Sequence, residues 1–122
     1  MIGDRSTRER GQEAEQAAAR FLERQGYRVL DRNFTTKFGE IDLICEKDGI
    51  LVFVEVRSLR SRTFHPLQTL TPAKMDRVRK AAEWYLTKTK QWGSRSCRFD
   101  IVGAVREGES WEILHIPDAY RW

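Results

Sequence analysis

Two short segments in the middle of the chain constrain its fold most. They are residues 39–44 (GEIDLI) and 52–57 (VFVEVR), and both are rich in the aliphatic residues of core strands. A short turn at residues 47–49 (KDG) separates them, so the two segments are predicted to pair as a β-hairpin. A sheet built on this hairpin must also accommodate acidic side chains, because both segments carry them.

These acidic side chains indicate a candidate metal site. Residues two apart in a strand share a face, so Glu40 shares a face with Asp42, and Glu55 shares a face with Arg57. Pairing of the strands would bring Asp42 beside Glu55 among apolar residues, where two carboxylates repel each other and resist desolvation. A divalent cation would relieve both effects, and Mg²⁺ prefers carboxylates, water and substrate phosphate as ligands.

The alternative is that the acids lie on the solvated outer face of an antiparallel sheet, where acidic and aliphatic residues commonly alternate. The run at residues 51–54 (LVFV) argues against this alternative, because it is apolar on both faces. Such a run is typical of a strand that is covered on both sides. We therefore favour the candidate metal site.

The pattern of apolar residues predicts an α/β domain with a mixed central sheet flanked by helices, in the order α-β-β-β-α-β-β. The predicted helices span residues 11–25 and 71–89, and the second has Thr71 as its N-cap and Pro72 at its first position. The predicted strands span residues 27–33, 39–46, 50–58, 98–105 and 111–116. Residues 1–10 are expected to form a flexible N-terminus, and residues 11–122 a single domain.

Composition limits the class of protein. Of the 122 residues, 40% are hydrophobic and 33% are charged, which is typical of a globular protein. No apolar run approaches the roughly 20 residues of a membrane span, and the N-terminus lacks the apolar segment of a signal peptide. We therefore expect a cytoplasmic protein without a membrane partner. Cys45 and Cys97 are the only cysteines, so a structural zinc site is not expected.

Basic residues surround the acidic hairpin in the sequence. The chain has a net charge of +4 and a pI near 9.3, a balance compatible with a polyanionic partner. Basic segments around a metal-site pattern suit the phosphate backbone of DNA, although a solvated surface is the alternative for each residue alone. The residues expected to contact DNA are Arg60, Arg62, Lys74 and Arg77.

The first predicted helix offers a third acid for the site. Glu15 lies on its apolar stripe, where it can approach the hairpin acids or lie at the wet edge and stabilise the helix start. Glu13 is the rival candidate on a neighbouring face. With Asp42 and Glu55 holding a cation, Glu15 would hold a metal-bound water or a second metal. The cation would acidify a water molecule and stabilise charge on a phosphate.

The spacing of Asp42 and Glu55-Val56-Arg57 resembles the PD-(D/E)xK nuclease signature, and the strand pair is similar to that of archaeal Holliday-junction resolvases. Over nearly its whole length, the chain resembles still more closely the YraN-like conserved bacterial family. The matching residues are Glu15, Ala18, Leu22, Gly26, Tyr27, Asn33, 39–44, 53–57, Lys74, Ala82, Tyr85, Leu86 and 98–100. The resemblance implies a restriction-endonuclease-like fold, Mg²⁺ or Mn²⁺ as cofactor, and DNA as substrate. A homodimer is also an option, since resolvases of similar fold act as two-fold dimers.

The chain departs from the nuclease signature at Arg57, where the signature has lysine. Arginine cannot be deprotonated in a protein and so cannot act as a general base, but it can bind a phosphate bidentately and stabilise the transition state. Lys74 could supply the missing ammonium group, or it could be an ordinary exposed lysine. Arg98 shares a strand face with Asp100, and the two could form an ion pair that supports the site.

The sequence therefore predicts a metal-dependent DNA endonuclease-like protein, acting on branched or single-stranded DNA in repair or recombination. Its predicted catalytic residues are Glu15, Asp42, Glu55 and Arg57, and the first three are also the predicted metal ligands. One alternative is a nucleic-acid-binding module of the same fold with little or no catalysis. Another is a protein-interaction subunit whose acids only pair with nearby arginines.

Overall fold

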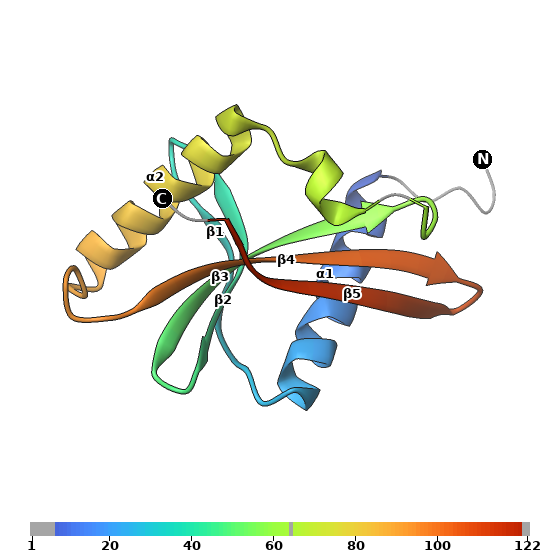
Figure 1. Ribbon diagram of the computed structural model, residues 1–122, viewed down its shortest axis with the longest axis horizontal. Coiled ribbons are helices and arrows are strands. Elements are labelled where there is room, and N and C mark those ends of the chain that lie inside the picture. Colours follow the sequence, from blue (N-terminus) through green and yellow to red (C-terminus); the bar gives the residue numbers. More distant parts are fainter. Residues whose placement is uncertain (1–6, 64, 121–122) are drawn as a thin grey trace.

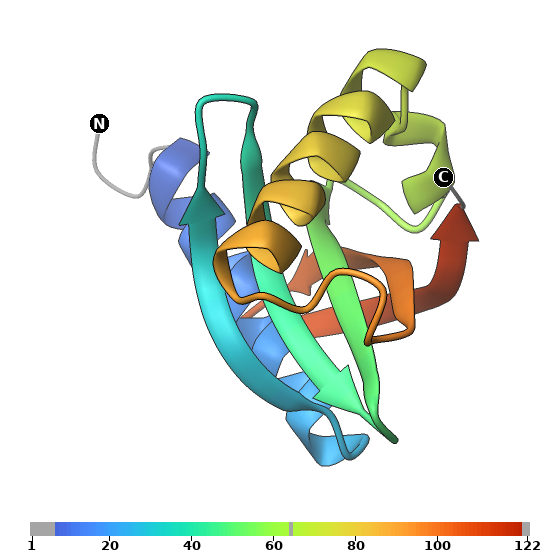
Figure 2. The same cartoon turned by 90° about the vertical axis from the view of Figure 1, so that its left-hand side faces the viewer.

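A five-stranded mixed sheet separates two α-helices in the computed structural model, which describes residues 7–63 and 65–120 (Figures 1 and 2). The elements are α1 (Thr7–Arg24), β1 (Arg28–Thr35), β2 (Glu40–Lys47), β3 (Ile50–Leu59), the 3₁₀ helix η1 (Pro66–Thr69), α2 (Pro72–Lys88), β4 (Cys97–Glu107) and β5 (Ser110–Tyr120). This order confirms the predicted α/β class and is consistent with a restriction-endonuclease-like fold.

The strands lie side by side in the order in which they occur in the chain. Neighbouring strands are antiparallel except β3 and β4, which are parallel. The predicted hairpin is formed by β2 and β3, and Asp48 and Gly49 in its turn have φ of 52° and 79°. Two positive φ angles suit the tight turns that match the twist of a hairpin. The parallel pair needs a long crossover, and this connection contains η1 and α2.

Each helix covers one face of the sheet, so the molecule has two apolar cores (Figure 1). On the α2 face, Phe53 and Phe99 pack with the helix residues Val78 and Leu86. The core on the α1 face contains Ala18, Leu22, Leu43, Cys45, Val52, Val54 and Val102. Successive residues of β3 therefore enter different cores, which explains the apolar run at residues 51–54.

Element boundaries differ from the prediction at the ends of the chain. Helix α1 begins at Thr7, so residues 7–10 are helical, and the flexible start expected for residues 1–6 lies outside the described residues. Helix α2 begins as predicted, with Thr71 Oγ1 accepting a hydrogen bond from the Lys74 N–H at 3.2 Å. Strand β5 continues past residue 116 because a register shift opposite residues 99–101 lets Tyr120 pair with Phe99.

Two further predictions concern membrane-spanning segments and the two cysteines. Neither described helix has the length and apolar character needed to cross a membrane. Cys45 is buried, Cys97 is partly buried, and both are free thiols.

Candidate functional site

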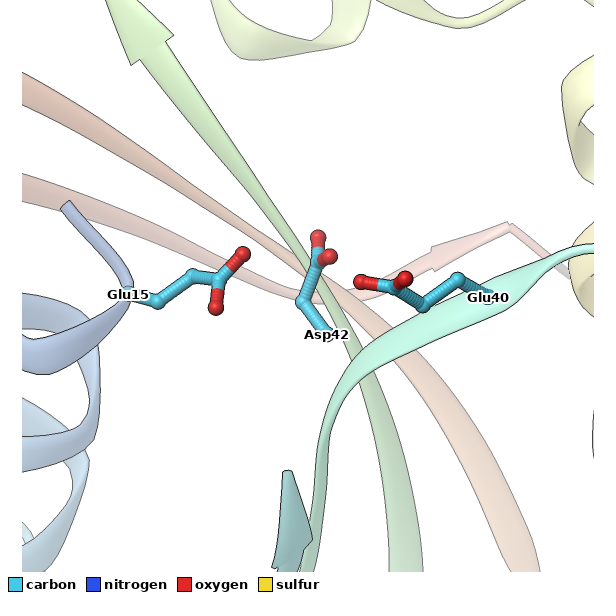
Figure 3. Close-up of side chains that lie close together, drawn as sticks. All are labelled: Glu15, Glu40 and Asp42. Carbon is cyan, nitrogen blue, oxygen red and sulfur yellow. The ribbon is translucent and has the colours of Figure 1, made fainter. Parts of the chain in front are cut away.

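Three carboxylates from α1 and β2 converge near the start of β2 (Figure 3). Glu15 points from α1 toward the two strand residues Glu40 and Asp42, and one oxygen of each carboxylate lies within 4.8 Å of the others. We call Glu15, Glu40 and Asp42 the acidic trio. Two of its members are predicted ligands, and the third, Glu40, was recognised in the sequence only as sharing a face with Asp42.

A break in the alternation of β2 positions Asp42. Strict alternation would put Ile41 and Leu43 on one face, but Ile41 lies in the α2 core and Leu43 in the α1 core. Backbone pairing of β2 with β3 runs only as far as Leu43 opposite Val54. One position further, Asp42 Oδ2 accepts a hydrogen bond from the Val56 N–H at 2.8 Å. The carboxylate therefore takes the place of a backbone partner where β2 leaves β3.

The surroundings of Asp42 disfavour its negative charge. Burial raises the pKa of Asp42 to about 7, against the opposing effect of the hydrogen bond from the Val56 N–H. The negative charges of Glu55, Glu15 and Glu40 act in the same direction as burial and are part of this rise in pKa. A divalent cation among these oxygens would reverse the effect, because an opposite charge favours the ionised carboxylate.

Asn33 on β1 orients the two glutamates of the trio. With its amide turned to suit its neighbours, Asn33 donates hydrogen bonds to Glu15 Oε1 at 2.8 Å and to Glu40 Oε1 at 3.1 Å. Burial and the charge of Glu40 raise the pKa of Glu15, whereas the bond from Asn33 lowers it. No role for Asn33 was predicted, but a signal was present in the sequence, because Asn33 is one of the residues that match the YraN-like family. Its φ of 53° is a conformation that asparagine adopts more readily than most residues.

Glu55 lies outside the trio, on β3, next to Arg57. Its Oε2 atom is buried without a hydrogen-bond partner, and the Arg57 Nε lies 3.4 Å away. Burial raises the pKa of Glu55, while the positive charges of Arg57 and Arg77 oppose the rise. Glu13, the rival candidate to Glu15, is paired with Arg106, whose Nη1 lies 3.3 Å from Glu13 Oε2.

Arg57 is held in place by η1. Its Nε donates to Thr69 Oγ1 at 3.1 Å, and its Nη2 donates to the Thr69 carbonyl at 3.4 Å. Helix η1 can pack this closely on β4 because residue 103 is glycine. A Cβ at Gly103 would lie 2.4 Å from Pro66 Cγ. The guanidinium group is thus fixed beside Glu55.

A basic cavity opens next to Arg57, where the parallel strands β3 and β4 end. It has a volume of about 1010 Å³, and its described lining holds no acidic residue but five cationic ones: Arg10, Arg57, Arg60, Lys74 and Arg106. Ligands of open α/β sheets usually bind at the carboxyl ends of the strands. The cavity therefore presents positive charge in the place where this architecture favours a ligand.

The four predicted DNA contacts lie in three different surroundings. Arg60 and Lys74 line the basic cavity. Arg62 is paired with Glu107 and Glu112 of the β4–β5 hairpin, with 2.6 Å to Glu112 Oε2. Arg77 lies beside the turn before β2, because a Cβ atom added at Gly39 would lie 3.3 Å from the Cβ atom of Arg77.

The predicted ion pair between Arg98 and Asp100 is present on β4. The Arg98 Nε and Nη2 donate to Asp100 at 2.8 and 2.9 Å, and the pair is linked to β5 by His115 Nε2 at 2.7 Å and the Asp118 N–H at 2.9 Å. Although burial alone would raise it, the pKa of Asp100 is lowered by the hydrogen bonds from His115, Arg98 and the Asp118 N–H. This network joins the two strands rather than forming an open site.

Comparison with known proteins gives one consistent family. The model of the family described as "Uncharacterised protein family UPF0102" matches residues 14–104. A UPF0102 protein of Syntrophomonas wolfei is 42% identical over 114 residues, which cover 93% of this chain and 98% of the relative. One of Myxococcus xanthus is 46% identical over 93% of this chain and 90% of its own length. One of Coxiella burnetii is 47% identical over 83% of this chain and 85% of its own length.

Proposed function

This chain belongs to the UPF0102 family, and from that premise we propose that it is a metal-dependent endonuclease that hydrolyses phosphodiester bonds of branched or single-stranded DNA. The observation that carries the proposal is the acidic trio of Glu15, Glu40 and Asp42, whose oxygens lie within 4.8 Å of one another. The basic cavity beside Glu55 and Arg57 supports an anionic substrate at the same end of the sheet.

The donor set suits a hard divalent cation. The trio offers only carboxylate oxygens, which Mg²⁺ and Mn²⁺ prefer. The raised pKa of Asp42 indicates negative charge that the protein leaves uncompensated, whereas the charge of Glu55 is partly balanced by Arg57, although its Oε2 accepts no hydrogen bond. Glu15, Glu40 and Asp42 would hold the ion, with Glu55 next to them. When bound, the ion would supply an acidified water and would neutralise charge on the phosphate.

The remaining residues bind and orient the substrate. Arg57 stabilises negative charge on a phosphate that enters the basic cavity, since a guanidinium group binds phosphate oxygens in a fixed geometry. Arg60 and Lys74 in the cavity lining provide backbone contacts that do not depend on base sequence. Asn33 holds the two glutamates in position.

A metal titration combined with a cleavage screen tests this proposal. We expect Mg²⁺ or Mn²⁺ to raise the melting temperature of the wild type, by the equivalent of about 2.7 kcal/mol at a concentration a hundred times the Kd. We also expect metal-dependent cleavage of at least one of duplex, single-stranded, flapped and four-way DNA. Asp42→Asn keeps an acceptor for the Val56 N–H, so it should remain folded and lose both effects. Equal thermal shifts in the two proteins would contradict the metal site.

The second candidate function is a DNA-binding module without catalysis. The observation that favours it is Arg57, which stands where the nuclease signature has lysine and is engaged by Glu55 and Thr69. This candidate predicts DNA binding that weakens steeply with salt, with no cleavage of any DNA form in either metal. The screen described above separates the two functions.

Among the described residues, no ion pair links the acidic trio to a lysine or arginine. The third possibility, a protein-interaction subunit whose acids only pair with nearby arginines, fits the pairs of Glu55 with Arg57 and of Glu13 with Arg106 but not the trio.

A further inference from the structure

The exposed side of α2 carries a regular stripe of cationic and aromatic residues. Arg77, Lys80, Trp84 and Lys88 follow one another at spacings of three and four, so they lie on one face of the helix. Trp84 is 50% exposed, which is unusual for so large an apolar side chain. The stripe from Arg77 to Lys88 is about 16 Å long, the length of about five nucleotides at the duplex spacing of roughly 3.4 Å.

The turn between β1 and β2 places a second exposed ring against this stripe. Phe38 and Trp84, with Thr36 and Lys37, line a small cavity of about 380 Å³. The turn is closed by the Thr36 N–H donating to the Gly39 carbonyl at 2.8 Å and by Thr36 Oγ1 accepting from the Phe38 N–H at 3.0 Å. Hydrogen bonds from the backbone and the side chain of Thr36 therefore close this turn. We call Phe38, Arg77, Lys80, Trp84 and Lys88 the aromatic track.

Two lysines lie against the Phe38 ring. The Nζ of Lys37 lies 5.3 Å and that of Lys80 lies 6.0 Å from the centre of the Phe38 ring. Lys80 also pairs with Asp76 at 3.2 Å, but exposed pairs of this kind contribute little and are easily exchanged. Two exposed rings, one of them with cations beside it, match a ligand that is itself flat and aromatic and carries negative charge beside the ring. A nucleotide has both properties.

We propose that the aromatic track binds an unpaired DNA strand, with a nucleobase stacked on Phe38 and Trp84 and the adjoining phosphates on Lys37 and Lys80. The identity of the ligand as DNA rests on the proposed function. Bases inside a duplex are stacked on each other and cannot cover a protein ring, whereas aromatic side chains and cations together bind single strands with little sequence preference.

The aromatic track and the acidic trio both have a member at or next to the turn between β1 and β2, namely Phe38 and Glu40. Glu40 follows Phe38 by two residues, at most about 7 Å along the chain. The Arg77 end of the track touches the same turn and influences the charge of Glu55. The unpaired part of a DNA strand that is bound on the track is therefore the part that reaches the trio. The substrate class that follows is DNA with unpaired nucleotides next to the cleaved bond.

The test measures binding rather than cleavage, in the presence of a chelator. The full chain is titrated into a fluorescent single-stranded oligonucleotide, an abasic oligonucleotide of the same length, and a duplex. We expect Phe38→Ala and Trp84→Ala each to weaken single-strand binding about tenfold, within the range found for loss of one stacked base. Their affinity for abasic DNA and for duplex should equal that of the wild type. Trp84→Phe should restore most of the lost affinity.

Trp92→Ala is the matched control, because Trp92 is 54% exposed and lies outside the track, with its indole N–H on Thr87. It should bind every DNA form as the wild type does. Equal wild-type affinity for normal and abasic strands would overturn the proposal, and so would unchanged binding by both alanine variants. Asp42→Asn separates this result from the proposed function: it should lose metal-dependent cleavage and keep the preference for strands with bases.

Discussion

Asp42 and Asp100 are acids of the same sheet, the first partly buried and the second fully buried, and their surroundings are opposite. Asp100 is fully enclosed and receives hydrogen bonds from Arg98, His115 and the Asp118 N–H, which lower its pKa. Among the described residues Asp42 receives one hydrogen bond, from the Val56 N–H, and its pKa is raised to about 7. Burial alone therefore does not decide the role of an acid in this molecule.

Asp100 and Asp42 differ in the source of the positive charge that balances their carboxylates. For Asp100 the protein supplies it, so the carboxylate stabilises the junction of β4 and β5. For Asp42 the nearest charged neighbours are other carboxylates, so the folded protein leaves the charge for something outside the chain to balance. An acid whose donors come from the protein is structural, whereas an acid short of donors is a candidate for binding a cation.

The largest effect is expected at Asp100. Asp100→Asn removes the carboxylate that holds Arg98 and His115, and removal of one partner from a buried pair typically destabilises a protein by 3–5 kcal/mol. Because Arg98 retains some exposure, we expect a loss of about 3 kcal/mol in the free energy of unfolding, measured by urea titration at neutral pH.

Asp48→Asn is the control for this change. Asp48 lies in the exposed turn between β2 and β3 with φ of 52°, which asparagine also tolerates. The free energy of unfolding of the Asp48→Asn variant should therefore equal that of the wild type. A stable Asp100→Asn protein would remove the distinction between the two acids.

The next effect has the opposite sign and depends on pH. The folded-state pKa of Asp42 is about 7, above the usual value of 3.8, so the folded protein binds this proton more tightly than the unfolded chain. The contribution of Asp42 is therefore fully present below pH 4 and is lost as the pH rises through 7. In metal-free buffer, Asp42→Asn should match the wild type near pH 4 and exceed its stability at pH 8 by on the order of 2 kcal/mol.

Asp100 gives the reference for the sign of this effect. Its folded-state pKa is lowered, so its contribution is present above its ordinary pKa and is lost as the pH falls through the folded-state value. The penalty of Asp100→Asn should thus shrink in acid, while the gain of Asp42→Asn grows toward alkaline pH. Parallel curves for the two variants, from urea titrations at several pH values, would contradict the contrast between the sites.

The element order and the Arg98–Asp100 pair could be predicted because both depend on local spacing. Alternation marks the strands, a Thr-Pro sequence marks the start of α2, and residues two apart on one strand must share a face. The shift of Ile41 and Leu43 to different cores could not be predicted in this way, because it depends on where β2 separates from β3. Glu40 lies in the trio with Glu15 and Asp42, and Glu55, the other predicted ligand, lies outside it.

Long-range partners explain the remaining differences. Arg62, a predicted DNA contact that stays a prediction, pairs in the fold with Glu107 and Glu112, which lie 45 and more residues further along the chain. Arg106 lines the basic cavity and was not anticipated, because only the pairing of β3 with β4 brings it near Arg57. Spacing in one segment carries no information on such encounters.

The smallest effect concerns Arg57, which stands between the two kinds of site. One part of its guanidinium group is held by Thr69, as a structural residue would be, and the same group lies on the basic cavity and forms an ion pair with Glu55. If Arg57 acts on the substrate by its charge, Arg57→Lys should keep or raise cleavage, since lysine occupies this place in the nuclease signature. Arg57→Ala should then slow single-turnover cleavage about tenfold or more, equivalent to roughly 1.4 kcal/mol of transition-state stabilisation.

A structural Arg57 gives a different pair of results on the same variants. Lysine cannot reproduce both bonds to Thr69, so Arg57→Lys and Arg57→Ala would each lower the free energy of unfolding, while DNA affinity per folded molecule would stay near the wild-type value. Arg62→Ala is the matched control, because Arg62 is an exposed arginine already paired with two acids, and its loss should change neither rate nor stability much. Urea titration and single-turnover cleavage of all three variants therefore decide whether Arg57 belongs with Asp100, whose charge is satisfied by the fold, or with Asp42, whose charge is left for a ligand.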